Sequence, residues 1–328
     1  MRYKQLGNTD LRFSAVSAGT WQLGGANWGD VSREESIKAI RAMVENGATT
    51  VDTAPIYGFG NAGMPENGYG NGERIVGEAI EGIRDKVQLV TKCALKLVPP
   101  AAPGERYTST RDMSRQEIIS GCEASLRRLK TDYVDLLFIH WPDGKTPLEE
   151  VCGALETLIR DGKIRHYGLS NFTVEDTLKA HSMVKCSAVQ LQYSMVNRNF
   201  EDVLKTMHEQ GIGTMTYGSL GSGILSGKYR TLPQFAPGDL RITFYDYFKE
   251  PKFSRIMKLL EKMDQIALER NVPVSHVALN WTVQKDFVDT AICGVSKVHH
   301  AVENCAAMEW SLTEEEMAML DKAVEEYA

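Results

Sequence analysis

The sequence predicts an α/β fold, a (β/α)8 TIM barrel formed by residues 1–328 as a single domain. Short apolar, β-branched segments alternate with amphipathic helical segments along most of the 328 residues, as in parallel strands joined by crossover helices. The segment 134–140 shows almost no polar alternation, which is typical of a strand covered on both faces. No linker rich in Pro, Gly and Ser divides the chain, so a doubly wound sheet with an extra domain is the second choice.

Eight strands are expected where β-branched and apolar residues lie between turn signals. They are 13–19, 49–54, 87–93, 134–140, 166–171, 188–194, 213–218 and 290–295. Amphipathic helices are expected near 32–46, 72–83, 114–129, 147–161, 173–184, 200–210, 252–270 and 275–285, and a further helix is expected to start near Val298. Ser114 with Glu117, and Thr313 with Glu316, have the spacing of capping boxes at helix starts.

Two loops are long and rich in glycine: 57–72 after the second strand and roughly 219–250 after the seventh. Loops of this length in compact domains are usually functional. The first contains G-x-G-x-x-G, from Gly58 to Gly63, which could mark a dinucleotide-binding turn. Such a turn needs a helix to open at once, whereas Pro65 and the following glycines delay any helix until about Asn71. The Rossmann interpretation is therefore disfavoured.

Composition excludes several classes of function. With 37 Lys+Arg against 43 Asp+Glu the net charge is −6, and no basic run is present, so nucleic acid and anionic membranes are not expected partners. No stretch approaches 18 apolar residues, and the first seven residues contain no signal-peptide core. The six scattered cysteines, without a C-x-x-C pair, predict reduced thiols in a cytoplasmic protein. No metal motif is present, and the oligomeric state is left open.

Polar residues fall at the ends of the predicted strands, where barrel enzymes place their active sites. They are Asp52, Tyr57, Lys92, His140, Ser170, Asn171, Gln190 and Tyr217. A tyrosine with a reference pKa near 10 needs help to transfer protons at neutral pH. We expect Lys92 to lower the pKa of Tyr57, and Asp52 to keep Lys92 charged. His140 could polarise a carbonyl oxygen. Because no side chain supplies hydride, the chemistry implies a nicotinamide cofactor and a small carbonyl or alcohol substrate.

At these positions the chain resembles the aldo-keto reductases over essentially its whole length. The matching motifs are Val51-Asp52-Thr53-Ala54-x-x-Tyr57-Gly58, Thr91-Lys92, Asp135-Leu136-x-x-Ile139-His140, Gly168-x-Ser170-Asn171-Phe172, Gln190-x-x-Tyr193, Gly223-x-Leu225-x-Gly227-Lys228 and Gly294-x-Ser296-Lys297. Segment 237–241 is similar to the bacterial branch related to potassium-channel β subunits and inositol-operon reductases. The resemblance implies a catalytic tetrad of Asp52, Tyr57, Lys92 and His140, with Tyr57 as general acid and base.

The resemblance also implies a cofactor site and a substrate site. The implied cofactor-binding residues are Thr20, Trp21, Asp52, Ser170, Asn171, Gln190, Tyr217, Gly218, Ser219, Leu220, Gly223, Lys228, Arg241, Gly294, Ser296, Lys297, His300, Glu303 and Asn304. The implied substrate contacts are Trp21, Tyr57, His140 and Trp141. Further aromatic candidates at the mouth are Trp28, Tyr69, Phe244, Tyr245 and Tyr247.

The chain departs from the family pattern at four places. Gly218-Ser219-Leu220 stands where relatives have Ser-Pro-Leu, Cys293 replaces a proline, His300 replaces a glutamine or arginine, and the segment 58–72 is longer than usual. We expect this insertion to border the substrate pocket. Ser296 and Lys297, just before a helix start, favour NADPH over NADH, with NADH still possible. The alternative function is a cofactor-binding redox sensor or regulatory subunit with slow turnover.

Overall fold

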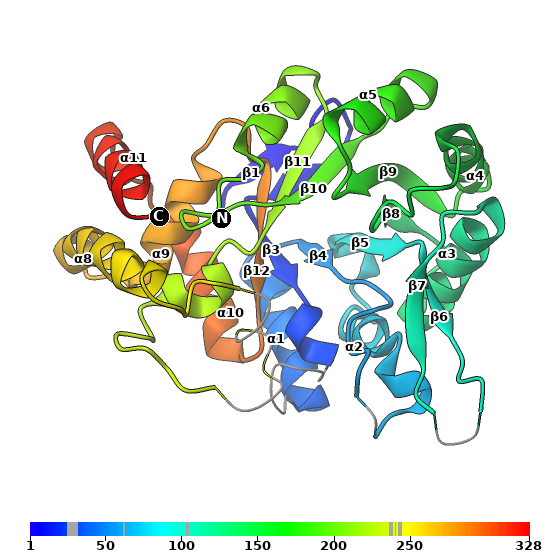
Figure 1. The fold of residues 1–328 in the computed structure, drawn as a ribbon, viewed down its shortest axis with the longest axis horizontal. Coiled ribbons are helices and arrows are strands. Elements are labelled where there is room, and N and C mark those ends of the chain that lie inside the picture. Colours follow the sequence, from blue (N-terminus) through cyan, green and yellow to red (C-terminus); the bar gives the residue numbers. More distant parts are fainter. Residues whose placement is uncertain (25–31, 62, 103–104, 236–238, 240, 242–244) are drawn as a thin grey trace.

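The computed structural model is a closed barrel of eight parallel strands, as the sequence predicts. It describes residues 1–24, 32–61, 63–102, 105–235, 239, 241 and 245–328. The barrel strands are β3 (Val16–Gly19), β4 (Thr50–Asp52), β5 (Gln88–Cys93), β8 (Val134–Ile139), β9 (Ile164–Ser170), β10 (Ala188–Gln192), β11 (Gly213–Tyr217) and β12 (Thr290–Gly294). They follow the chain order around the barrel, and β12 closes it by pairing in parallel with β3 (Figure 1).

The first predicted strand, 13–19, is in fact parts of two elements. Residues up to Ser14 belong to β2 (Arg12–Ser14), which pairs antiparallel with β1 (Tyr3–Gln5), and only β3 enters the barrel. The hairpin closes the N-terminal end of the barrel, where Leu6, Leu11 and Phe13 are buried among the inward-facing apolar side chains of the strands. The polar and apolar pattern of 13–19 does not show where β2 ends and β3 begins, because the residues on both sides of that point are buried.

The predicted helices are all present, with shifted ends. They are α1 (Arg33–Glu45), α2 (Asn71–Ala79), α3 (Arg115–Leu129), α4 (Leu148–Arg160), α5 (Val174–Met183), α6 (Glu201–Glu209), α8 (Lys252–Arg270), α9 (Val274–Val283) and α10 (Val298–Ala306). A last helix, α11 (Glu314–Tyr327), begins with the full capping box of Thr313 and Glu316. At Ser114 the side chain accepts from the Glu117 N–H, as expected. None of the described helices is long and apolar enough to cross a membrane.

A second hairpin was not predicted. It consists of β6 (Leu95–Val98) and β7 (Thr108–Arg111), which pair antiparallel directly after β5. Its residues are mostly exposed and mix polar and apolar types without alternation, so the strand pattern is weak. Figure 1 shows this hairpin and the long loops after β4 and β11 at the lower end of the view, whereas β1 lies toward the upper end. The C-terminal ends of the barrel strands therefore open onto the long loops.

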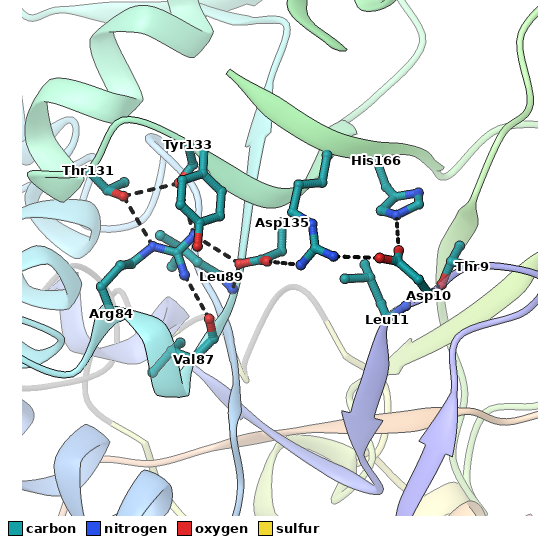
Figure 2. A network of polar contacts seen from close by, with 11 residues as sticks. Thr9, Asp10, Leu11, Arg84, Val87, Leu89, Thr131, Tyr133, Asp135 and His166 are labelled. Carbon is teal, nitrogen blue, oxygen red and sulfur yellow. Dashed lines mark hydrogen bonds and ion pairs between the residues drawn. The ribbon is translucent and has the colours of Figure 1, made fainter. Parts of the chain in front are cut away.

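A charged network at the opposite, N-terminal end fixes the closing hairpin to the barrel (Figure 2). Buried Asp135, on β8, accepts from the guanidinium groups of Arg84 and Arg165, each at 2.9 Å. Arg165 also binds Asp10 at 2.6 Å, and the His166 ring lies 2.7 Å from the other Asp10 oxygen. Polar networks at this end of a barrel contribute to stability and not to catalysis.

Candidate active site

The centre of the site is a buried lysine between a carboxylate and a phenol. Asp52 ends β4, and Lys92 lies on the neighbouring strand β5 with no exposed surface. The Lys92 ammonium donates to both Asp52 oxygens at 2.8 Å, to the Thr53 carbonyl at 3.0 Å and to the Tyr57 hydroxyl at 3.1 Å. A buried charge is tolerated only when it is paired and hydrogen-bonded in this way. The geometry therefore places Tyr57 within proton-transfer distance of a fixed cation.

Tyr57 lies in a tightly packed turn after β4, and glycines permit the packing. Gly58 has φ +103°, and a Cβ there would lie 2.8 Å and 2.9 Å from the carbonyl oxygens of Gly24 and Gly68. The Gly72 N–H donates to the Tyr57 carbonyl at 2.9 Å, and a Cβ on Gly72 would meet the Tyr57 Cβ at 2.9 Å. The glycines of this loop thus allow close backbone approach around Tyr57.

The pKa of Tyr57 differs from the expectation. Burial of the phenol, followed by the negative charge of Asp52, raises this pKa well above its usual range. The lowering that was expected from Lys92 is outweighed, because the ammonium is already neutralised by the carboxylate behind it. Tyr57 therefore carries its proton at neutral pH, which suits a proton donor.

His140 follows β8 and faces the same space. Its ring centroid lies 6.2 Å from that of Tyr57, in an edge-on arrangement. Burial, Lys92 and Arg111 hold the pKa of His140 well below its usual range, so the imidazole is neutral. Its Nδ1 is buried and has no hydrogen-bond partner among the described residues. A neutral imidazole beside the phenol can donate one N–H to a carbonyl oxygen.

The ends of the next three strands form a connected polar network. Gln190 donates to Asp52 at 2.8 Å, and the Ser170 hydroxyl donates to the Gln190 carbonyl at 3.0 Å. Asn171, in the left-handed region with φ +63°, donates to the His140 carbonyl at 3.1 Å and accepts from the Tyr217 hydroxyl at 3.1 Å. The structure therefore brings all of these predicted residues together around the tetrad.

The first strand adds an aromatic side to the site. Thr20 is buried and its hydroxyl donates to the Asp52 carbonyl at 2.9 Å. The Trp21 ring stacks on Tyr57 with centroids 6.3 Å apart and an angle of 29°. Trp141, directly after His140, packs instead under the guanidinium of Arg111 at 4.8 Å. Trp28 and Phe244 lie outside the described residues. Tyr245 stacks on Tyr247 at 5.2 Å, and the Tyr69 hydroxyl donates to the Leu95 carbonyl.

The loop after β11 contains several residues with a left-handed backbone conformation. Gly218, Gly221, Ser222 and Gly223 all have positive φ, and a Cβ on Gly223 would meet no atom closer than 3.7 Å. Neighbouring residues with this backbone conformation can turn their N–H groups toward one concavity, a cradle that a phosphate can fill. Predicted neighbours of this loop are placed as follows. The Ser219 hydroxyl donates to the Ile292 carbonyl at 3.3 Å, and Leu220 is half-buried. The Lys228 ammonium lies over the Tyr229 ring. The Arg241 guanidinium binds Asp239 and the Tyr229 hydroxyl.

Two lysines, Lys297 and Lys228, form a cationic group beside the residues predicted for the adenosine end. Gly294 ends β12, Ser296 and exposed Lys297 precede α10, and Asn304 is buried within that helix. Burial and His299 lower the pKa of His300 against the opposing pull of Glu303, and Lys297 and Lys228 add to the lowering. Lys228 and Lys297, which come from two different loops, thus both act on His300. This donor set fits the phosphates of a nicotinamide dinucleotide.

Sequence reasoning assigns no role to three further residues near the site. Glu73 is buried and binds Thr91, the neighbour of Lys92, and Arg128. Arg111 comes from the unpredicted hairpin, and Asp239 neutralises Arg241. Among the described residues no group of three or more His, Cys, Asp and Glu could hold a metal ion.

Comparisons with known proteins identify the family of this chain. Residues 15–325 match the model of the Aldo/keto reductase family. The chain is 33% identical to aldo-keto reductase YhdN of Bacillus subtilis, over 99% of this chain and 94% of that one. The chain belongs to the aldo/keto reductase family, and the resemblance expected from the motifs is confirmed.

Solved structures extend the comparison to the fold. The structure of a glycerol dehydrogenase from Gluconobacter oxydans superimposes with a TM-score of 0.87 at 29% identity, covering 99% of this chain and 96% of that one. An aldo/keto reductase from Klebsiella pneumoniae, solved in complex with NADP and acetate, has a TM-score of 0.70 at 29% identity, covering 97% and 93%. The (β/α)8 barrel is therefore that of a nicotinamide-dependent oxidoreductase.

Proposed function

We propose that residues 1–328 act as one reductase unit that converts a small aldehyde or ketone to an alcohol, with Tyr57 as proton donor and NADPH as preferred cofactor. The observation that carries this proposal is the buried contact of Lys92 with both Asp52 and Tyr57. A proton donor, a fixed cation and a neutral imidazole converge there. That combination is suited to placing a proton on the oxygen of a carbonyl group that accepts hydride.

Each of the four residues of the tetrad has its own role in the reaction. His140 donates a hydrogen bond to the carbonyl oxygen, and Tyr57 gives that oxygen its proton. Lys92 stabilises the phenolate that remains, and Asp52 keeps Lys92 charged. The bound nicotinamide supplies the hydride. In the direction of oxidation Tyr57 would take the proton back, so the same arrangement serves an alcohol substrate.

Three groups of residues would hold the cofactor. Ser170, Asn171, Gln190 and Tyr217, with Thr20 and Trp21, surround the nicotinamide end. The cradle of Gly218 to Gly223, with Lys228 and Arg241, suits the pyrophosphate, and Gly294 to Asn304 suits the adenosine. The preference for NADPH is supported by the cationic group around Lys297 and by the NADP complex of the Klebsiella relative.

The substrate would lie against Trp21, Tyr57, His140 and Trp141, bordered by the segment 58–72. The six cysteines are free and buried, which supports a reducing, cytoplasmic location as part of the proposal.

Steady-state oxidation of NADPH with a panel of aldehydes and ketones tests the function. We expect turnover of about 1–10³ s⁻¹ on at least one compound, the range of typical enzymes. Turnover well below roughly 1 s⁻¹ on every compound would contradict a metabolic reductase and favour the redox-sensing regulatory subunit.

A further inference from the structure

The unpredicted hairpin β6–β7 brings a cation to the rim of the active site. Ala94, with φ +68°, turns the chain out of β5 just two residues after Lys92, and β6 begins at the next residue. Leu95 pairs with Arg111, the last residue of β7. The Tyr69 hydroxyl also donates to the Leu95 carbonyl, which ties the hairpin to the segment that follows Tyr57. Arg111 is therefore held beside the strand end that carries the catalytic lysine.

The Arg111 side chain lies against the other catalytic strand. Its guanidinium is 4.8 Å from the centroid of the Trp141 ring and donates to the Pro142 carbonyl at 3.3 Å. Trp141 directly follows His140. Stacking on an aromatic face holds a guanidinium in place but leaves its remaining N–H groups able to bind an anion.

No carboxylate of the described residues lies within ion-pairing distance of Arg111. Asp112, the sequence neighbour of Arg111, and Asp143, the sequence neighbour of Pro142, are engaged elsewhere. Asp112 faces Lys96 and accepts from the Ser114 N–H, and Asp143 accepts from the Met113 N–H and the Thr146 hydroxyl. Lys96, on the adjacent strand, has two acidic partners, Asp112 and Glu117. Of the two cations on the strands of this hairpin, Lys96 and Arg111, only Arg111 has no ion pair with a carboxylate of the described residues.

The charge of Arg111 also acts on His140. Together with burial and Lys92 it keeps the pKa of His140 low, and the carboxylate of Asp52 is already bound by Lys92. Because Lys92 and Asp52 pair with each other, Arg111 supplies a further positive charge near His140, and such a charge attracts anionic ligands.

We propose that Arg111 is a specificity-determining residue that selects carbonyl substrates bearing an anionic group, a carboxylate or a phosphate. A planar guanidinium binds either anion through two parallel hydrogen bonds. The proposal rests on the reductase function above and adds to it the chemical class of the substrate.

Matched pairs of substrates test the proposal. Succinate semialdehyde is compared with butanal, and glyceraldehyde 3-phosphate with glyceraldehyde, in the wild type and in Arg111→Met. We expect the charged-to-neutral ratio of kcat/KM to fall about tenfold in the variant for one pair or both, the loss typical of a charge-assisted contact. The pair that responds identifies carboxylate or phosphate. The neutral member of each pair is the internal reference, because a general loss of activity lowers both members and leaves their ratio unchanged.

Lys96→Met is the matched control, because it removes one positive charge from the same hairpin at a cation that already has carboxylate partners. Its ratio should stay close to that of the wild type, and Arg111→Lys should retain part of the preference. An unchanged ratio in Arg111→Met for both pairs, or an equal fall in Lys96→Met, would overturn the proposal.

A binding measurement separates this inference from the proposed function. Titration calorimetry with succinate and with inorganic phosphate needs no turnover. If the wild type reduces neither member of a pair, the reductase function is at fault, whereas Arg111-dependent binding of either anion would still support the inference. The inference would be contradicted if the wild type bound neither succinate nor phosphate. It would also be contradicted if Arg111→Met bound both anions as tightly as the wild type.

Discussion

The carboxylate of Glu73, which has no exposed surface, accepts a hydrogen bond of 2.6 Å from the hydroxyl of Thr91, the residue that precedes Lys92. Its other oxygen binds the Arg128 guanidinium at 2.6 Å. Glu73 lies at the start of α2, immediately after the segment that follows Tyr57. The contact thus joins the loop that follows Tyr57 to the strand of Lys92.

Replacing Arg128 by Met is expected to destabilise the protein by about 3–5 kcal/mol, because Glu73 would remain buried without its counter-charge. Chemical denaturation measures the loss. Arg127→Met is the matched control, since Arg127 is the exposed neighbour on the same helix and should cost within about 0.5 kcal/mol. An equal loss of free energy of unfolding in both variants would show that the ion pair of Glu73 and Arg128 contributes no more to stability than an exposed arginine.

Tyr57→Phe is expected to lower kcat by roughly 10²–10⁴-fold, the contribution of a positioned proton donor. The ring and its packing on Trp21 are kept, so the Kd of NADPH, measured by fluorescence, should be almost unchanged. A variant that retains more than about a tenth of the wild-type kcat would contradict the role of Tyr57.

Lys92→Met is expected to lose both activity and stability. Asp52 is 2% exposed, and without the ammonium it is a buried carboxylate with only neutral donors, at a cost of about 3–5 kcal/mol. The double variant Asp52→Asn with Lys92→Met removes that charge and should regain part of the stability in urea denaturation. If the double variant is as unstable as the sum of the single ones, the two residues are not energetically coupled.

Lys297→Ala is expected to weaken NADPH binding much more than NADH binding, because only NADPH brings a further phosphate to the cationic group near α10. We expect about tenfold for the phosphate contact. Isothermal titration with both cofactors measures it. Equal affinities of the wild type for the two cofactors, or an equal loss of both in the variant, would reject the preference for NADPH.

Asp143 is expected to make the stability of the protein depend on pH in the acidic range. Burial would raise its pKa, but hydrogen bonds from Thr146 and from backbone N–H groups prevail and lower it from 3.8 to about 2. Its contribution to stability is therefore complete above pH 3.8 and is lost as the pH falls toward about 2. The Tm of Asp143→Asn should be below that of the wild type at neutral pH, and the difference should shrink between these values. A constant difference down to pH 2 would contradict the assignment.

Much of the barrel could be predicted because its parallel strands are buried on both faces, so that runs such as 134–140 have no competing interpretation. The candidate site residues could be proposed for a related reason. Barrel strands place their last polar residues at one end, and Asp52, Lys92 and His140 each lie at or next to the end of a strand. The hairpin β6–β7 lacks such a run, because solvent covers it and its pairing is set by backbone hydrogen bonds alone.

Other features depended on distances that a sequence does not contain. The raised pKa of Tyr57 results from the balance between burial and the neutralised pair of Lys92 and Asp52. Glu73 looks like an ordinary surface residue of a helix start until Thr91 and Arg128 are brought to it in space. The glycines from Gly58 to Gly72 suggest a flexible loop, whereas the structure uses several of them for close backbone contacts.

The hairpin β1–β2 has a consequence for how the two ends of the barrel tolerate substitution. Leu6, Leu11 and Phe13 pack against the apolar side chains inside the barrel, so the residues at this end serve packing, as is typical of the N-terminal end of such a barrel. The polar residues of the candidate site lie at the opposite ends of the strands. Substitutions in the hairpin are therefore expected to lower the free energy of unfolding, and the C-terminal loops are left to vary with the substrate.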